Sequence, residues 1–232
     1  MCSASKKRIK LNWYTKNEFY SWFEPTTSLA DIKKICKGQA VLDLLICGQE
    51  FETYHRYMPS LQEEYEGNEA RIGFDFEEED GPSLHLFFTE KGCIIVPSAC
   101  ENFSSVEGAF EKQIPKEFQA FYRKNYHEQD IPFVICAQED KPWQLITQFE
   151  IEEEIFTLKH LCADPEFYKD WATIFFGEET EYLNDDASTE TIEALYQGKV
   201  LSEAMVYTIV GSVQDWLFLE EELNHIPYRF DF

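Results

Sequence analysis

The sequence predicts an α+β fold in a single domain spanning residues 1–232, with a mostly antiparallel sheet mid-chain, helices packed on it and a helical C-terminal third. Apolar and polar residues alternate in the middle of the chain, which is typical of strands with one buried face. From residue 151 onward the apolar spacing becomes helical. Apolar residues are 44% and aromatic residues 16% of the 232 residues, and this composition excludes a disordered chain. No repeat or Ser/Gly-rich linker divides the sequence.

The N-terminal part predicts a mobile tail and two helices. Residues 1–10 form the tail, and residues 17–23 a short helix. Ser28 is a favourable N-cap for the second helix, which we expect Gly38 to end. Residues 40–58 leave two interpretations open, because their apolar run fits either a buried strand or one side of a helix.

The middle of the chain predicts strands. Arg71-Ile-Gly-Phe-Asp-Phe76 alternates, and so do the apolar residues of 84–88. Lys91-Gly92 predicts a turn into the strand Cys93-Ile-Ile-Val96. The strand of residues 84–88 and the strand of residues 93–96 form a hairpin, and we expect residues 77–82 to be the loop before it.

A helix and a second strand pair follow. Pro115 is suited to the first position of a helix, and the four aromatic residues on one side of that helix indicate a buried face: Phe118, Phe121, Tyr122 and Tyr126. Residues 132–136 and 143–147 predict the strand pair.

Three helices are expected in the C-terminal third. Asp164-Pro165-Glu166 combines an N-cap, a first-position proline and a first-turn acid. The second helix covers residues 188–197 and is closed by Gly198. The third is expected to run from residue 202 to residue 223, because one apolar stripe continues through it.

The charge of the chain is strongly negative and uneven. The net charge is −24 and the pI is near 4.5. Residues 1–149 contain 24 acids and 16 bases (net −8), whereas residues 150–232 contain 20 acids and 4 bases (net −16). Such a field repels nucleic acid and anionic lipid and attracts a basic protein. Solubility alone is the other explanation of the charge. If a docking surface exists, we expect it in the C-terminal third.

The cysteines indicate a reducing compartment. There are seven, an odd number, and most lie in apolar runs, as reduced cysteines of a protein core do. No run reaches the ~18 apolar residues of a membrane span, and polar residues interrupt the segment that follows the basic residues 6–10. We therefore expect a cytoplasmic protein with all seven cysteines reduced.

Five acids in residues 74–88 raise the question of a metal site: Asp75, Glu77, Glu78, Glu79 and Asp80. A calcium loop needs oxygen ligands at positions 1, 3 and 5, Gly at 6 and Glu at 12. Setting Gly81 as position 6 places Phe76 at position 1 and Phe87 at position 12, so the template fails. The stretch predicts a solvated loop, with a rim for a basic partner or a weak divalent site as the alternatives.

No stretch carries a recognisable catalytic or cofactor signature. His160 and Cys162 are too close for a zinc knuckle, because on a helix they point about 200° apart. His85 lies opposite the apolar face of residues 84–88, which indicates a sheet-surface residue rather than a general base. There is no P-loop, nucleophile elbow or dinucleotide fingerprint. We therefore predict no catalytic residue, no cofactor and no metal.

The C-terminal half carries a resemblance. Five segments recur in order: Pro132-Phe-Val-Ile-Cys136, Trp143, Asp164-Pro-Glu-Phe-Tyr-Lys-Asp-Trp171, Ile192-Glu-Ala-Leu-Tyr196 and Ile226-Pro-Tyr228. This pattern, over residues 130–228, resembles uncharacterised bacterial proteins associated with immunity proteins of polymorphic toxin systems. Residues 114–121 are similar to the helix opening of SUKH-type immunity proteins, but the Asn-Gly-Gly that should follow is missing. The motifs are aromatic and structural, so no residue roles come with them.

The sequence therefore favours a non-enzymatic acidic binding protein that occludes a basic partner, such as a nuclease-like toxin, and that binds neither nucleic acid nor membrane. The alternatives are a cytoplasmic enzyme with an unrecognised cleft, or a structural or regulatory subunit. The expected partner-binding residues are five acids of the C-terminal third: Glu178, Glu179, Glu181, Asp185 and Asp186. The oligomeric state is left open.

Overall fold

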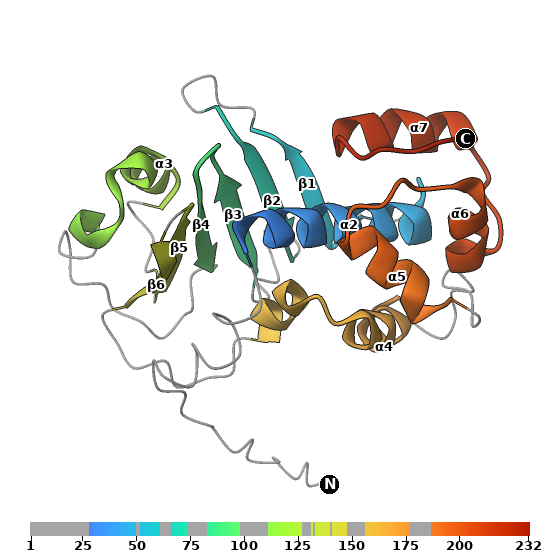
Figure 1. The fold of residues 1–232 in the computed structure, drawn as a ribbon, viewed down its shortest axis with the longest axis horizontal. Coiled ribbons are helices and arrows are strands. Elements are labelled where there is room, and N and C mark those ends of the chain that lie inside the picture. Colours follow the sequence, from blue (N-terminus) through green and yellow to red (C-terminus); the bar gives the residue numbers. More distant parts are fainter. Residues whose placement is uncertain are drawn as a thin grey trace, which may run out of the picture.

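A computed structural model describes residues 28–49, 52–60, 66–73, 83–97, 111–126, 131, 133–139, 141–147, 156–176 and 187–232. The predicted tail, the helix at 17–23 and the loop at 77–82 lie outside these segments. Within them, a six-stranded antiparallel sheet with helices packed on it confirms the α+β fold, and helices make up the C-terminal part (Figure 1).

The strands follow one another across the sheet in the order of the sequence, so that each pairs with the next. They are β1 (His55–Pro59), β2 (Asn68–Ile72), β3 (Leu84–Phe88), β4 (Gly92–Pro97), β5 (Phe133–Gln138) and β6 (Lys141–Thr147). The predicted hairpin around Lys91-Gly92 is confirmed, with Phe88 opposite Cys93. The second strand pair is confirmed too, with Phe133 opposite Thr147. The strand expected over residues 71–76 is shifted, because β2 covers Asn68–Ile72 and Gly73 follows it, while residues 74–76 lie outside the described segments.

The sheet separates two apolar cores. On one face, Ile94 and its neighbours pack with Phe118 and Phe121 of α3 (Lys116–Tyr126), which begins directly after Pro115, preceded by the 3₁₀ turn η1 (Glu111–Gln113). On the other face, Ile95 belongs to the larger core that the remaining helices cover. Strand β4 is therefore buried along its whole length.

The larger core is built around α2 (Leu29–Cys47), which lies across one face of the sheet (Figure 1). The surrounding elements are η2 (Phe156–Cys162), a 3₁₀ helix, and the α-helices α4 (Pro165–Phe175), α5 (Thr189–Tyr196), α6 (Glu203–Val210) and α7 (Trp216–His225). None of the helices in these described segments combines the length and apolar character that a membrane span requires.

The N-terminal end of α2 was predicted correctly and its C-terminal end was not. The Ser28 hydroxyl accepts a hydrogen bond from the Asp31 amide at 3.1 Å. The helix then continues through Gly38 to Cys47, so the apolar run that begins at residue 41 is helical. Gly38 does not end the helix; the absence of a side chain there lets α5 approach α2 closely. A Cβ atom at this position would lie 3.0 Å from the Leu195 carbonyl carbon and oxygen of α5.

The prediction of a single helix over residues 202–223 was wrong. α6 ends at Val210 and is capped by Gly211, whose φ of 68° suits glycine and whose amide donates to the Tyr207 carbonyl oxygen at 3.0 Å. α7 begins after Asp215, whose carboxylate accepts from the Phe218 amide at 3.0 Å. The apolar stripe continues across the break, and for this reason periodicity alone did not reveal it. The expected N-cap of α4, Asp164, is confirmed, and Ser188 caps α5.

The five cysteines in the described segments are free thiols: Cys36, Cys47, Cys93, Cys136 and Cys162. Burial raises the pKa of the Cys36, Cys93 and Cys136 thiols. They therefore stay protonated and pack as small apolar side chains.

We expect Gly38→Val to destabilise the protein by about 2 kcal/mol or more. The branched side chain would collide with the backbone of α5, and overpacking of this kind costs ~1–3 kcal/mol, whereas the better helix propensity of valine returns only a few tenths. Urea unfolding followed by circular dichroism measures the change. An unchanged or higher free energy of unfolding would contradict the close contact between α2 and α5.

Candidate functional site

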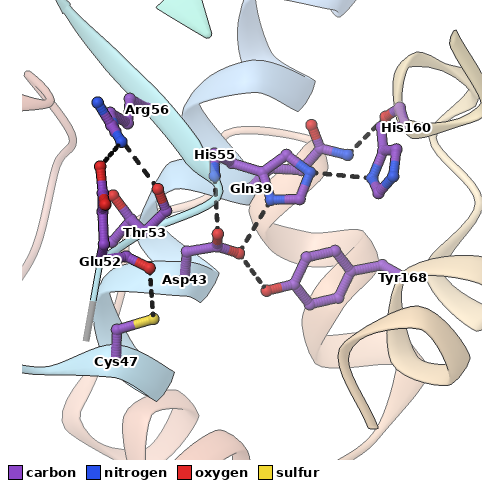
Figure 2. Close-up of polar contacts among 9 residues, drawn as sticks. All are labelled: Gln39, Asp43, Cys47, Glu52, Thr53, His55, Arg56, His160 and Tyr168. Carbon is purple, nitrogen blue, oxygen red and sulfur yellow. Dashed lines mark hydrogen bonds and ion pairs between the residues drawn. The ribbon is translucent and has the colours of Figure 1, made fainter. Parts of the chain in front are cut away.

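The most distinctive polar arrangement in the described structure is a chain of hydrogen bonds inside the larger core (Figure 2). It connects Asp43 of α2, His55 at the start of β1 and His160 of η2. Each of these three side chains is at most 2% exposed. Burial this complete makes hydrogen bonding obligatory, because an unsatisfied polar group in a core costs ~1–3 kcal/mol or more.

The Asp43 carboxylate is the acceptor at one end of this chain. The backbone N–H of His55 donates to one oxygen at 2.8 Å. The other oxygen accepts from His55 Nδ1–H at 3.0 Å and from the Tyr168 hydroxyl at 2.8 Å. Three donors from two other elements, β1 and α4, thus satisfy one buried carboxylate. Figure 2 shows them converging on Asp43.

These bonds link the two histidine rings to the carboxylate. Asp43 accepts from Nδ1–H of His55, and His55 Nε2 lies 2.9 Å from Nδ1 of His160, so that one of these two nitrogens donates to the other. The orientation of His160 is supported on the backbone side, where Gln39 Nε2 donates to its carbonyl oxygen.

Burial makes this network unfavourable for additional charge. Burial, and to a smaller extent the neighbouring His55, lowers the pKa of His160 to about 2. Burial also raises the pKa of Tyr168 well above its usual value, and the Asp43 charge adds to that increase. His160 and Tyr168 are therefore neutral at physiological pH.

Chemically, an acid and two imidazoles in line could relay a proton, as in hydrolases that use an Asp–His pair. A catalytic group must however reach its substrate, and ligand sites are concave and open to solvent. The rings of Tyr54, Phe167 and Trp171 surround His160 with centroids 5.0–5.6 Å away. We interpret this chain of hydrogen bonds as a core element that holds α2, β1, η2 and α4 together.

Sequence reasoning missed most of this network. His160 was considered only as a zinc ligand with Cys162, and Asp43 and His55 were not considered. Cys162 bonds instead to the Leu158 carbonyl oxygen, and no group of three potential metal ligands occurs among the described residues. One signal was present: Asp43 interrupts the apolar run Val41-Leu-Asp-Leu-Leu45, and an acid in a buried run requires donors.

His85 lies on the α3 side of the sheet, opposite Leu84 and Leu86 as predicted, but it packs against Phe121 of α3, and its side chain is 11% exposed. Its Nε2 lies 3.0 Å from the Glu69 carboxylate, and its Nδ1 bonds to the Tyr126 hydroxyl at the end of α3. The hydrogen bond from His85 lowers the pKa of Glu69. These contacts connect β2 and β3 to α3, which gives His85 a structural role.

A second candidate site lies on the surface of the C-terminal helices. The break between α6 and α7 places Tyr207 against Trp216, with ring centroids 5.8 Å apart, and Trp216 against Phe232 at 4.8 Å. The terminal segment is held by a bridge between Leu201 and Phe230, which includes a 2.9 Å bond from the Leu201 amide to Arg229. Two side chains of this surface are strongly exposed: Tyr207 at 42% and Leu217 at 73%.

The same region is acidic. Residues 187–232 contain eight acids and only Lys199 and Arg229 as bases. Six of the acids are exposed: Glu190, Glu193, Glu203, Asp215, Glu221 and Asp231. The five acids predicted to bind a partner, Glu178, Glu179, Glu181, Asp185 and Asp186, lie outside the described residues, as do the five acids of 75–80.

No protein-family model, curated protein or solved structure matches the chain.

We expect Asp43→Asn to lower the free energy of unfolding by about 3–5 kcal/mol. An amide offers a single acceptor oxygen to three donors and turns its own N–H groups toward them. Tyr168→Phe, which removes only one of the donors, should cost less, about 1.5–3 kcal/mol. Urea unfolding at pH 7.5 measures both, and an equal or smaller cost for Asp43→Asn would contradict the central position of this carboxylate.

We also expect stability to fall as the pH is lowered below about 6.5. His160 stays neutral in the folded protein, whereas in the unfolded chain it binds a proton near pH 6.5. One such group removes about 1.4 kcal/mol for each pH unit below 6.5. In His160→Asn, whose side-chain amide can replace the hydrogen bond of Nδ1, that part of the slope should disappear. The measurement is urea unfolding between pH 7.5 and 5. Parallel pH profiles for the two proteins would show that His160 can be protonated in the folded state.

Proposed function

We propose that this chain is a non-enzymatic binding protein whose acidic C-terminal third docks on a basic protein partner. The observation that carries this proposal is the combination, on one described segment, of six exposed acids with exposed apolar side chains such as Tyr207 and Leu217. Exposed acids alone are common on soluble proteins. Protein interfaces add apolar and aromatic anchors inside a polar rim, and the C-terminal segment offers both.

The charge of the chain favours a protein partner over other anions. A net charge of −24 repels nucleic acid and anionic lipid and accelerates encounter with a cationic surface. Because residues 150–232 carry net −16, approach would be oriented with this part of the chain toward the partner. Screening shortens the range to about 10 Å at 0.1 M salt, so association should depend strongly on ionic strength.

The resemblance of residues 130–228 to proteins associated with immunity to polymorphic toxins suggests the kind of partner. A nuclease-like toxin needs a cationic cleft for its substrate. An acidic protein that covers this cleft would inhibit by occlusion, without chemistry of its own, in the cytoplasm where such a toxin acts. Neither a cofactor nor a metal is required for that role.

The alternatives are an enzyme or a structural or regulatory subunit. The line of Asp43, His55 and His160 is the observation that favours an enzyme, and its complete burial argues against one. The neighbouring gene distinguishes the classes. A large secreted protein with a basic C-terminal domain would favour immunity, and its toxic activity should be blocked by stoichiometric amounts of this chain.

We expect reversal of the C-terminal acids to slow association with a cationic partner. The variant carries five changes to Lys: at Glu178, Glu179, Glu181, Asp185 and Asp186. It should reduce the association rate and flatten its dependence on salt, because steering acts mainly on the rate of encounter. Stopped-flow or surface-based kinetics with the basic domain encoded by the neighbouring gene measure this effect.

The matched control reverses five acids in the first half of the chain: Glu66, Glu77, Glu78, Glu79 and Asp80. Glu66 is used because it is exposed, whereas Glu69 is only 8% exposed and bonds to Ser60 and His85. Both variants change net charge equally. Equal slowing would mean that the overall field matters, and greater slowing by the control would place the contact on residues 66–80.

A further inference from the structure

Four aromatic rings form a connected cluster at the C-terminal end of the fold, which we call the aromatic cluster: Tyr207, Trp216, Phe230 and Phe232. Adjacent ring centroids are 4.8–5.8 Å apart. None of the four is fully buried. Leu217 follows Trp216 on α7 and is more exposed than any of the four rings, at 73%, so α7 adds an exposed apolar side chain next to the cluster in the sequence.

Acids accompany this surface at regular spacing. Glu203 precedes Tyr207 by four residues on α6, and Glu221 follows Leu217 by four residues on α7. Side chains four residues apart on a helix are neighbours. Glu220 bears the same relation to Trp216. Asp231 lies between Phe230 and Phe232, and it is exposed.

Among the described residues, no Lys, Arg or His pairs with Glu203, Glu220, Glu221 or Asp231. On α7, Glu222 pairs with His225 at 3.2 Å. The surface therefore presents apolar rings and uncompensated carboxylates together.

The combination of apolar rings and carboxylates limits the kind of partner that can bind this surface. A second copy of this chain would place like charges against each other, which costs stability at an interface. Nucleic acid and anionic membranes are repelled for the same reason. Arginine suits both features, because its guanidinium stacks on an aromatic face while its fork of N–H groups bonds a carboxylate. Lysine offers a point charge and stacks less well.

We propose that the aromatic cluster and its acids form the anchor for arginine side chains of a basic partner. This inference rests on the proposed function and locates its central contact. Arginine from the partner lies on Tyr207 and Trp216 and pairs with Glu203 or Glu220, while its methylene stem, or an adjacent apolar residue, covers Leu217. The acids of residues 178–186 then act in steering rather than in the anchor.

The test uses the full-length protein and two fluorescein-labelled probes, octa-arginine and octa-lysine, in anisotropy titrations at about 0.1 M salt. Wild-type protein should bind octa-arginine more tightly than octa-lysine. Tyr207→Ser/Leu217→Ser should weaken octa-arginine binding by at least about tenfold and remove the preference over lysine. The matched control is Ile174→Ser on α4, which replaces an apolar residue that is 82% exposed and should leave both affinities unchanged.

The possible outcomes separate the anchor from the broader proposal. If Glu203→Lys/Glu221→Lys weakens binding but Tyr207→Ser/Leu217→Ser does not, the anchor is overturned and an acidic binding protein remains. If neither variant changes binding, both the anchor and docking through the described C-terminal helices fail. Equal effects of Ile174→Ser and Leu217→Ser would also overturn the anchor. Sedimentation that shows a dimer dissociated by Leu217→Ser would assign the surface to a second copy.

Discussion

The helical layer of this fold depends on one buried carboxylate. Apolar packing is non-directional and would allow α2, β1, η2 and α4 to slide or rotate against one another. The hydrogen bonds that converge on Asp43 allow only one arrangement, because His55 and Tyr168 must both point at the same carboxylate. His160 extends the same restriction to η2. A single acid thus converts a generic apolar core into one with defined registry, a role best attested for buried polar groups elsewhere.

On each face of the sheet, a histidine hydrogen-bonded to a carboxylate connects the sheet to the layer that covers it, but the two histidines are buried to different degrees. On the α2 side the histidines are sealed in the core. On the α3 side His85 joins the Glu69 carboxylate to the Tyr126 hydroxyl at a partly exposed position. His55 and His85 each contact an acid with one ring nitrogen and reach a second element with the other. The sheet is therefore connected to its covering layers by directional bonds as well as by packing.

The sequence predicted what is local and failed where distant parts of the chain meet. Alternation located β3, the turn at Lys91-Gly92 located the start of β4, and the caps at Ser28 and Asp164 located two helix starts, since these signals lie within a few residues. Gly38 was misread because its reason is Leu195, which lies far along the chain. Asp43 and His160 are more than a hundred residues apart, so no pattern joined them. For the candidate surface, composition indicated the acidic C-terminal third, but the meeting of Tyr207 and Trp216 depends on a helix break that periodicity concealed.

The central position of α2 has a consequence for synthesis of the protein on the ribosome. The sheet is a succession of hairpins, so each strand can pair with the one made just before it. One side of α2 packs on the sheet and contacts β1, which follows it directly. Its other side waits for η2 and for α4 to α7, and about 140 residues separate its last residue from the first residue of α5. At 5–20 residues per second, that side stays uncovered for roughly 7–30 s during translation. The nascent chain therefore presents the apolar side of a helix early and covers it only when the C-terminal helices emerge.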